Sequence, residues 1–179
     1  MAEFNPGELV IRPISETDSV NSLSMGEQEF TPLKAFLRGS AKRFHAASIA
    51  RTYVLAQEEH PNRVYGYLTL VASEVGLEGA YVINDCNEAN GYTDLPAVKI
   101  ARLAVDRRLR GLGYGPMFVD LAIDIARTQI VPWIGCRFMI VDSKKSSIGF
   151  YERHGFRLID TPANCDQQHP TMFLDLHKL

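Results

Sequence analysis

The stretch that decides the fold runs from Leu103 to Gly115 and reads Leu-Ala-Val-Asp-Arg-Arg-Leu-Arg-Gly-Leu-Gly-Tyr-Gly. A strand-like run ends here, three glycines stand at alternate positions, and an amphipathic pattern begins. Such a turn lets backbone N–H groups converge on an anion, and the following helix N-terminus adds partial positive charge. We call residues 110–115 the glycine turn. Arg110, its first residue, can supply a full positive charge. The pattern predicts a phosphate-binding turn; the alternative is a tight connection with no ligand.

Two other phosphate-binding motifs fit the glycine turn poorly. A P-loop needs Lys followed by Ser or Thr after its last glycine, whereas Pro116 and Met117 follow here. A dinucleotide-binding fold has its glycine motif in the first strand–helix unit, with an acid about 20 residues later. Here the motif lies past mid-chain, and the next strand-like run, 136–141, reads Cys-Arg-Phe-Met-Ile-Val. Both motifs are therefore disfavoured.

The elements on both sides of the glycine turn predict one sheet. Thr31-Pro32 is typical of a helix start, and apolar spacing from Leu33 to Phe44 predicts one helix there. Further helices are expected at 116–128 and 146–153, and 74–92 reads as an irregular insertion. The expected strands are 9–13, 51–57, 63–73, 97–105, 137–141, 156–159 and 171–176, with a hairpin through 58–62. This order predicts an α/β (α+β) fold: a single mixed, largely antiparallel sheet of six or seven strands with helices on both faces.

Composition sets limits on the function. The 179 residues suit a single domain over 1–179, and a net charge of −2 argues against bulk coating of nucleic acid. Neither the three cysteines nor the five histidines show metal-ligand spacing, so no metal is expected. The first residues lack a secretory pattern, and no run approaches the roughly 18 apolar residues of a membrane span. We expect a cytoplasmic protein without a membrane partner.

A second motif, Phe150-Tyr151-Glu152-Arg153-His154-Gly155-Phe156, follows the expected fifth large strand. Together with the glycine turn it makes the sequence resemble the GNAT superfamily of acyl-CoA-dependent N-acyltransferases. That family has Arg/Gln-x-x-Gly-x-Gly/Ala at the end of its fourth strand and Tyr-x-x-x-Gly-Phe after its fifth. The resemblance spans roughly 9–176, although Lys144 stands where the family often has Asn.

The resemblance implies acetyl-CoA as co-substrate and gives roles to particular residues. Tyr151 is implied as the general acid that protonates the CoA thiolate, the alternative being that it only packs against the cofactor. No base is singled out: Glu74, His45, Asp142 or a water could accept the amine proton. The implied cofactor-binding residues are Leu103, Ala104 and Val105 along the pantetheine arm, Arg110, Gly111, Leu112, Gly113, Tyr114 and Gly115 at the pyrophosphate, and Phe150.

Other segments look like GNAT-type toxins of bacterial toxin–antitoxin systems, notably 50–55, 66–70 and 101–106. Those toxins acetylate the α-amine of aminoacyl-tRNA and are held inactive by an antitoxin. Residues 32–52 hold five basic residues and no acid, which fits a phosphate-contacting surface as well as a solvated helix face. The toxin pattern lapses at 27–32. The candidate tRNA contacts are Lys34, Arg38, Lys42 and Arg43.

The sequence therefore predicts an enzyme that moves acetyl from acetyl-CoA to a primary amine by direct attack. The acceptor is a small molecule, a protein amine or an aminoacyl-tRNA. The last case is the toxin-like alternative, which would add an antitoxin partner; a homodimer is a further expectation. A CoA-binding module without catalysis and a nucleic-acid-binding protein are the competing classes.

Overall fold

The computed structural model describes residues 8–57 and 63–179. Its strands are β1 (Leu9–Pro13), β2 (Arg51–Gln57), β3 (Val64–Val75), β4 (Leu95–Val105), β5 (Phe138–Asp142), β6 (Arg157–Leu158) and β7 (Thr171–Asp175). Its α-helices are α1 (Thr31–Gly39), α2 (Ala41–Ala46), α3 (Tyr114–Ile125), α4 (Ile148–Glu152) and α5 (Pro162–Cys165). None of the helices in the described ranges is long and apolar enough to cross a membrane.

The seven strands form one sheet in the order β1-β2-β3-β4-β5-β7-β6. β1 with β2, β2 with β3, β5 with β7 and β6 with β7 pair antiparallel, while β4 and β5 pair parallel. The predicted mixed, largely antiparallel sheet is confirmed. The parallel register runs from Ala97 opposite Phe138 to Lys99 opposite Ile140.

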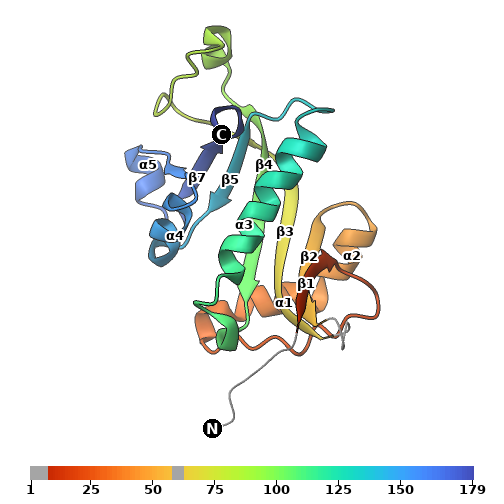
Figure 1. The fold of residues 1–179 in the computed structure, drawn as a ribbon. Helices are drawn as coiled ribbons and strands as arrows, with labels where there is room; N and C mark the ends of the chain where they lie inside the picture. The colour runs from red at the N-terminus through yellow and green to blue at the C-terminus, as the bar shows by residue number, and fades with distance from the viewer. Residues whose placement is uncertain (1–7, 58–62) are drawn as a thin grey trace. The chain divides into compact units, whose positions relative to one another are not determined.

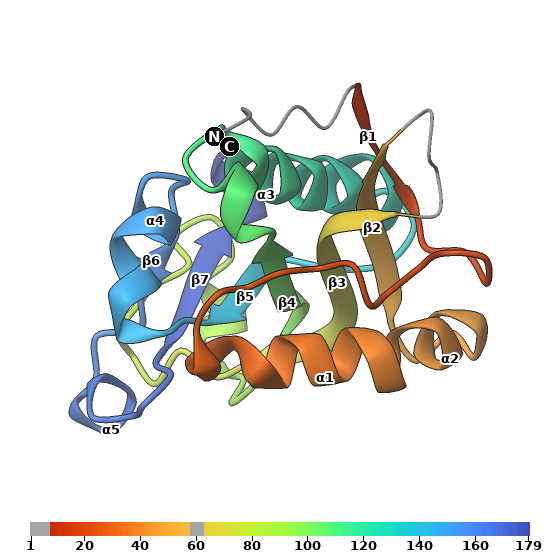
Figure 2. The ribbon, with the colours of Figure 1, turned by 90° about the horizontal axis from the view of Figure 1, so that it is seen from below.

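Contacts group the chain into two compact units that both contain parts of β3 and β4, residues 1–71 with 101–119 and residues 72–100 with 120–179. In the first unit, α1 and α2 cover one face of β2 and β3 and the beginning of α3 covers the other (Figure 2). Neighbouring residues of β3 contact the helices on the two faces in turn. The Tyr67 hydroxyl donates to the Leu33 carbonyl of α1 at 2.8 Å, whereas a Cβ on Gly66 would lie 3.1 Å from the Phe118 ring of α3.

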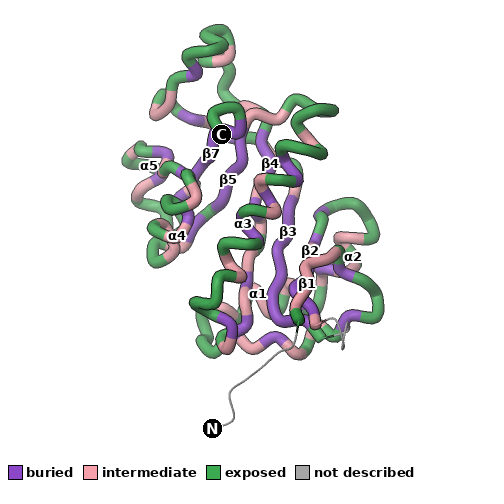
Figure 3. The backbone as a smooth tube through the Cα atoms, in the orientation of Figure 1, coloured by how far each residue is buried: buried purple, intermediate pink, exposed green. Residues whose placement is uncertain are grey.

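The second unit has an aromatic core. The ring of Tyr81 lies 5.0 Å from that of Phe173, and the Phe138 ring lies 5.9 Å from Phe173. Tyr81 belongs to the insertion that extends beyond the strand ends in Figure 1, and Arg137 ties this insertion to β7 through Asp85 and Asp175. Strands β2, β3, β5 and β7 are largely buried, whereas the edge strand β1 has no buried residue (Figure 3).

Several sequence expectations need correction. The single helix expected from Leu33 to Phe44 is broken at Ser40, whose φ of −131° is not helical, so α1 and α2 are separate. Gly39, with its low helix propensity, precedes the break. α3 begins at Tyr114 instead of 116, and α5 was not expected at all. The proposed hairpin turn at 58–62 lies outside the described residues.

Candidate active site

Two glycines of the glycine turn have a backbone that other residues rarely adopt. Gly111 has φ +80° and Gly113 has φ +88°, in the left-handed region where a side chain is strained. A Cβ added at either position would meet no atom within 4 Å. The space over the turn is therefore open, and the glycines are required by the conformation of the backbone.

Backbone donors gather where the glycine turn enters α3. In the described part of the chain, no hydrogen bond uses the N–H groups of Gly111, Gly113, Tyr114 or Gly115, whereas the Leu112 N–H donates to Leu109 at 3.3 Å. The first N–H groups of a helix lack partners within the helix, and the helix dipole favours an anion there. The turn thus offers the donors that a phosphate needs, and phosphate binding there stays a prediction.

The Arg110 side chain contacts residues of segment 25–30 of the protein. Its guanidinium donates to the Met25 carbonyl at 2.7 Å and to the Glu27 carboxylate at 3.3 Å, and it lies 4.6 Å from the centroid of the Phe30 ring. The Arg110 N–H donates weakly to Arg107, at 3.5 Å. Direct pairing of this guanidinium with a phosphate stays a prediction.

Asp106 is a residue that the sequence reasoning did not recognise. Its carboxylate is fully buried and accepts from the Ser24 N–H at 2.9 Å and the Arg108 N–H at 3.0 Å. The Arg108 side chain adds two bonds of 2.8 Å. Burial opposes ionisation, but these bonds outweigh it and lower the pKa of Asp106. An Asp two residues before its N–H donor is a capping pattern, and that was the available signal.

Leu103, Ala104 and Val105 are the last three residues of β4, directly before Asp106. The β4–β5 register ends at Lys99, so on the side of β5 this stretch lies beyond the paired residues. Its role in binding pantetheine as an added strand stays a prediction.

Tyr151 of α4 belongs to the second unit, as does Phe150. Its ring lies 4.9 Å from the Phe150 ring and 5.5 Å from the Phe156 ring, and only 7% of the residue is exposed. Burial raises the pKa of Tyr151 above its ordinary value, so the hydroxyl keeps its proton at neutral pH. These are properties of a proton donor.

The four candidate tRNA contacts lie on α1 and α2. Arg38 is exposed and Lys34 half-buried on α1. Lys42 donates to the Glu16 carbonyl, and Arg43 donates to the Gly39 carbonyl at 2.6 Å and 3.1 Å. Because carbonyls do not neutralise a cation, both side chains keep their positive charge. All four cations thus gather on two neighbouring helices of one unit.

The candidate bases have different surroundings. His45 Nδ1 accepts the Thr52 N–H at 3.0 Å, and burial together with Arg51 lowers the pKa of His45, which leaves it neutral. Asp142 pairs with Lys99 at 2.5 Å and accepts from the Thr171 hydroxyl at 3.0 Å. The Asp142 carboxylate is therefore already ion-paired before it could accept a proton.

A polar pocket of about 200 Å³ lies within the second unit. Glu74, Glu78 and Asp142 line it together with Lys99. Two of the candidate bases, Glu74 and Asp142, therefore share one cavity, and three carboxylates against one ammonium group favour a cationic guest.

The family assignment follows from the whole sequence. The sequence profile of the acetyltransferase (GNAT) family matches residues 24–156, more than half of the chain, and this range holds both the glycine turn and Tyr151. The chain belongs to the acetyltransferase (GNAT) family. It is therefore an acetyltransferase, as its sequence predicts, and its seven-stranded sheet is the sheet of that family.

One relative and two solved structures of the same fold illustrate the similarity. A tRNA-acetylating toxin of Mycobacterium tuberculosis (strain ATCC 25618 / H37Rv) is 29% identical over 84% of this chain and 85% of its own. The structure of AtaT complexed with acetyl-methionyl-tRNAfMet has a TM-score of 0.80 and 23% identity, covering 96% of both chains. A tyrosine-to-phenylalanine mutant of AtaT, bound to the C-terminus of the antitoxin AtaR and acetyl-CoA, has a TM-score of 0.74 and 22% identity over 95% and 94% of the chains.

Proposed function

We propose that this acetyltransferase uses acetyl-CoA and binds its pyrophosphate at the glycine turn. The observation that carries the proposal is that, among the hydrogen bonds of the described residues, the N–H groups of Gly111, Gly113, Tyr114 and Gly115 have no partner where α3 begins. A phosphate there gains several charge-assisted bonds, and the open space over Gly111 and Gly113 lets it approach.

Acetyl transfer by direct attack needs one acid and one acceptor of a proton. The neutral amine nitrogen attacks the thioester carbonyl carbon, the C–N bond forms, and the C–S bond breaks. Tyr151 donates its proton to the departing thiolate and is reprotonated from water. The proton that the amine loses passes to water or to a carboxylate. Protonation of Tyr151 at neutral pH supports this role.

The polar pocket suits the amine acceptor. An amine arrives in water mainly as its ammonium form, which the carboxylates of Glu74 and Asp142 attract. Glu74 is exposed at the pocket and is the carboxylate that we assign to receive the amine proton, since Asp142 is already paired with Lys99. An α-amine with a pKa near 8 requires little help in losing that proton.

The acceptor that we propose is the α-amine of an aminoacyl-tRNA. Two facts support it. One relative described above is a tRNA-acetylating toxin and one similar structure holds an acetylated aminoacyl-tRNA. Four cations also gather on α1 and α2, namely Lys34, Arg38, Lys42 and Arg43. Such a surface gives sequence-independent affinity for a phosphate backbone. An antitoxin partner is proposed on the same basis, from the AtaR complex. A homodimer remains a prediction, which light scattering of the purified chain tests.

A panel of acceptors tests this function. The purified chain is incubated with labelled acetyl-CoA and charged tRNA, peptides or polyamines, and the label is followed by mass. We expect label in charged tRNA. Label confined to peptides or polyamines would keep the acetyltransferase but contradict the tRNA acceptor. No melting-temperature rise with saturating acetyl-CoA would contradict the cofactor itself.

A further inference from the structure

We infer that Asp106 is a positioning residue for acetyl-CoA: it holds the glycine turn in its binding shape by joining Ser24 to Arg108. The inference rests on the proposed binding of acetyl-CoA at that turn.

The first support is the number of bonds that meet at one buried carboxylate. Both Asp106 oxygens are used, Oδ1 by the N–H and Nε of Arg108 and Oδ2 by the Ser24 N–H and Arg108 Nη2. The Asp106 N–H also donates to the Tyr65 carbonyl of β3 at 2.7 Å. The residue is therefore fixed at its backbone and at its side chain.

The second support is that several residues of segment 24–30 contact the stretch 106–110. The Arg107 N–H donates to the Ser24 carbonyl at 2.8 Å, and a Cβ on Gly26 would lie 3.2 Å from Arg107 Cδ. Beyond it, Arg110 reaches Met25 and Glu27. The chain from 106 to 110 is thus held at both ends, directly before the four N–H groups that the proposed phosphate would use.

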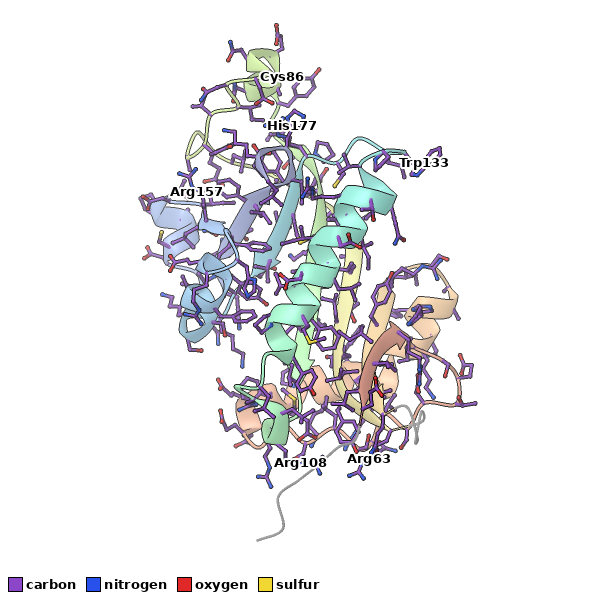
Figure 4. All side chains as sticks on the ribbon, in the orientation of Figure 1. Arg63, Cys86, Arg108, Trp133, Arg157 and His177 are labelled. Carbon is purple, nitrogen blue, oxygen red and sulfur yellow. The ribbon has the colours of Figure 1, made fainter. Side chains whose placement is uncertain are left out.

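The third support is the placement of Arg108, which Asp106 orients. The guanidiniums of Arg108 and Arg63 lie 5.8 Å and 5.2 Å from the Tyr65 ring centroid, and Figure 4 shows both labelled at the same end of this unit. A cation held by a buried carboxylate cannot turn toward a phosphate. Asp106 and Arg108 therefore act on the cofactor through the backbone.

A turn that is ordered before binding spares the ligand the cost of ordering it. Asp106→Asn keeps the size of the side chain but replaces one acceptor with an NH2 group that faces donors. The turn should then fluctuate, and the Kd for acetyl-CoA should rise about tenfold or more. The turnover at saturating acetyl-CoA should change little, because Asp106 does not touch the reacting atoms.

The chain offers a matched control in Asp18. Its carboxylate is also buried. It accepts hydrogen bonds from Nη1 and Nη2 of Arg12 at 2.9 Å and 2.6 Å and from the Ser15 N–H at 2.8 Å. It makes no bond to residues 106–115 among the contacts of the described residues. Asp18→Asn should lower the melting temperature as much as Asp106→Asn does, while the Kd for acetyl-CoA stays as in wild type.

The experiment measures acetyl-CoA binding by calorimetry and KM and kcat for both variants and wild type. We expect a raised Kd and KM with kcat within about threefold for Asp106→Asn alone. Equal Kd values for Asp106→Asn and wild type, or equal weakening by Asp18→Asn, would overturn the inference. If Asp106→Asn does not fold, Arg108→Lys replaces it, with an expected rise of about threefold; an unchanged Kd there overturns it too. Wild type that fails to bind acetyl-CoA would contradict the proposed function instead.

Discussion

Arg110 of the glycine turn stacks its guanidinium on Phe30, 4.6 Å from the ring centroid, and Phe30 directly precedes α1. The proposed phosphate-binding turn and the first basic helix are therefore joined by a contact between residues far apart in the sequence. A cation over an aromatic face is stabilising by about 0.5–2 kcal/mol, and the bond to the Met25 carbonyl adds to it.

Arg110→Lys tests whether this geometry or the charge alone matters. Lysine keeps the charge but loses the planar fork that reaches Met25 and Phe30 together. We expect the Kd for acetyl-CoA to rise several-fold and the melting temperature to fall. Calorimetry and thermal unfolding measure both, with the exposed Arg127→Lys as control. A wild-type Kd in Arg110→Lys would show that the charge is sufficient.

Gly113→Ala should weaken acetyl-CoA binding about tenfold or more. A left-handed alanine costs roughly 1–2 kcal/mol, and relief of that strain turns the N–H groups away. Gly39→Ala is the control, because its Cβ would meet nothing within 4 Å and alanine favours the helix by about 1 kcal/mol. Equilibrium binding of acetyl-CoA to both variants measures the effect, and equal affinities would contradict the proposed role of the turn.

Tyr151→Phe should lower turnover about 100-fold while the acetyl-CoA Kd stays within about threefold. The ring contacts with Phe150 and Phe156 are kept, so only the hydroxyl is lost. Tyr92→Phe, at an exposed position, is the control. Steady-state rates of the two variants and wild type measure the effect. Turnover of Tyr151→Phe equal to that of wild type would show that Tyr151 only packs and does not donate the proton.

Alkaline pH should destabilise the protein from about pH 10 upward. Burial raises the pKa of both Tyr67 and Tyr151 in the folded chain, whereas unfolded tyrosines ionise near pH 10. Above that pH the unfolded chain loses protons that the folded chain keeps, so the free energy of unfolding falls; below it these residues cause no change. Urea unfolding at about pH 8 and pH 11 measures this, and Tyr151→Phe should flatten the fall. Equal stability of wild type at both pH values would refute the expectation.

The sheet was predictable from sequence because its signals are local. β1, β2 and β7 lie within one or two residues of their expected bounds, since alternating apolar runs bounded by polar residues or proline mark strands directly. The motifs around Arg110 and Tyr151 were likewise visible as spacings. The break at Ser40 was not, since a helical period continues through it.

The support behind the turn could not be predicted because it depends on contacts distant in sequence. Asp106 bonds Ser24, 82 residues away, and Arg110 bonds Met25, 85 residues away. No pattern within either segment indicates its partner. The pocket that Glu74 shares with Asp142 likewise requires β3, β4 and β5 to be placed in one sheet.

Acetyl transfer to charged tRNA tests the account most directly. Wild type and Tyr151→Phe are each mixed with labelled acetyl-CoA and either aminoacylated tRNA or the same tRNA after deacylation. The tRNA is then digested, and the masses of its 3′-terminal fragments are measured by mass spectrometry. The account predicts one acetyl group on the α-amine of the aminoacyl end with wild type, a rate about 100-fold lower with Tyr151→Phe, and none on deacylated tRNA. No acetylated aminoacyl end with wild type that binds acetyl-CoA would contradict it.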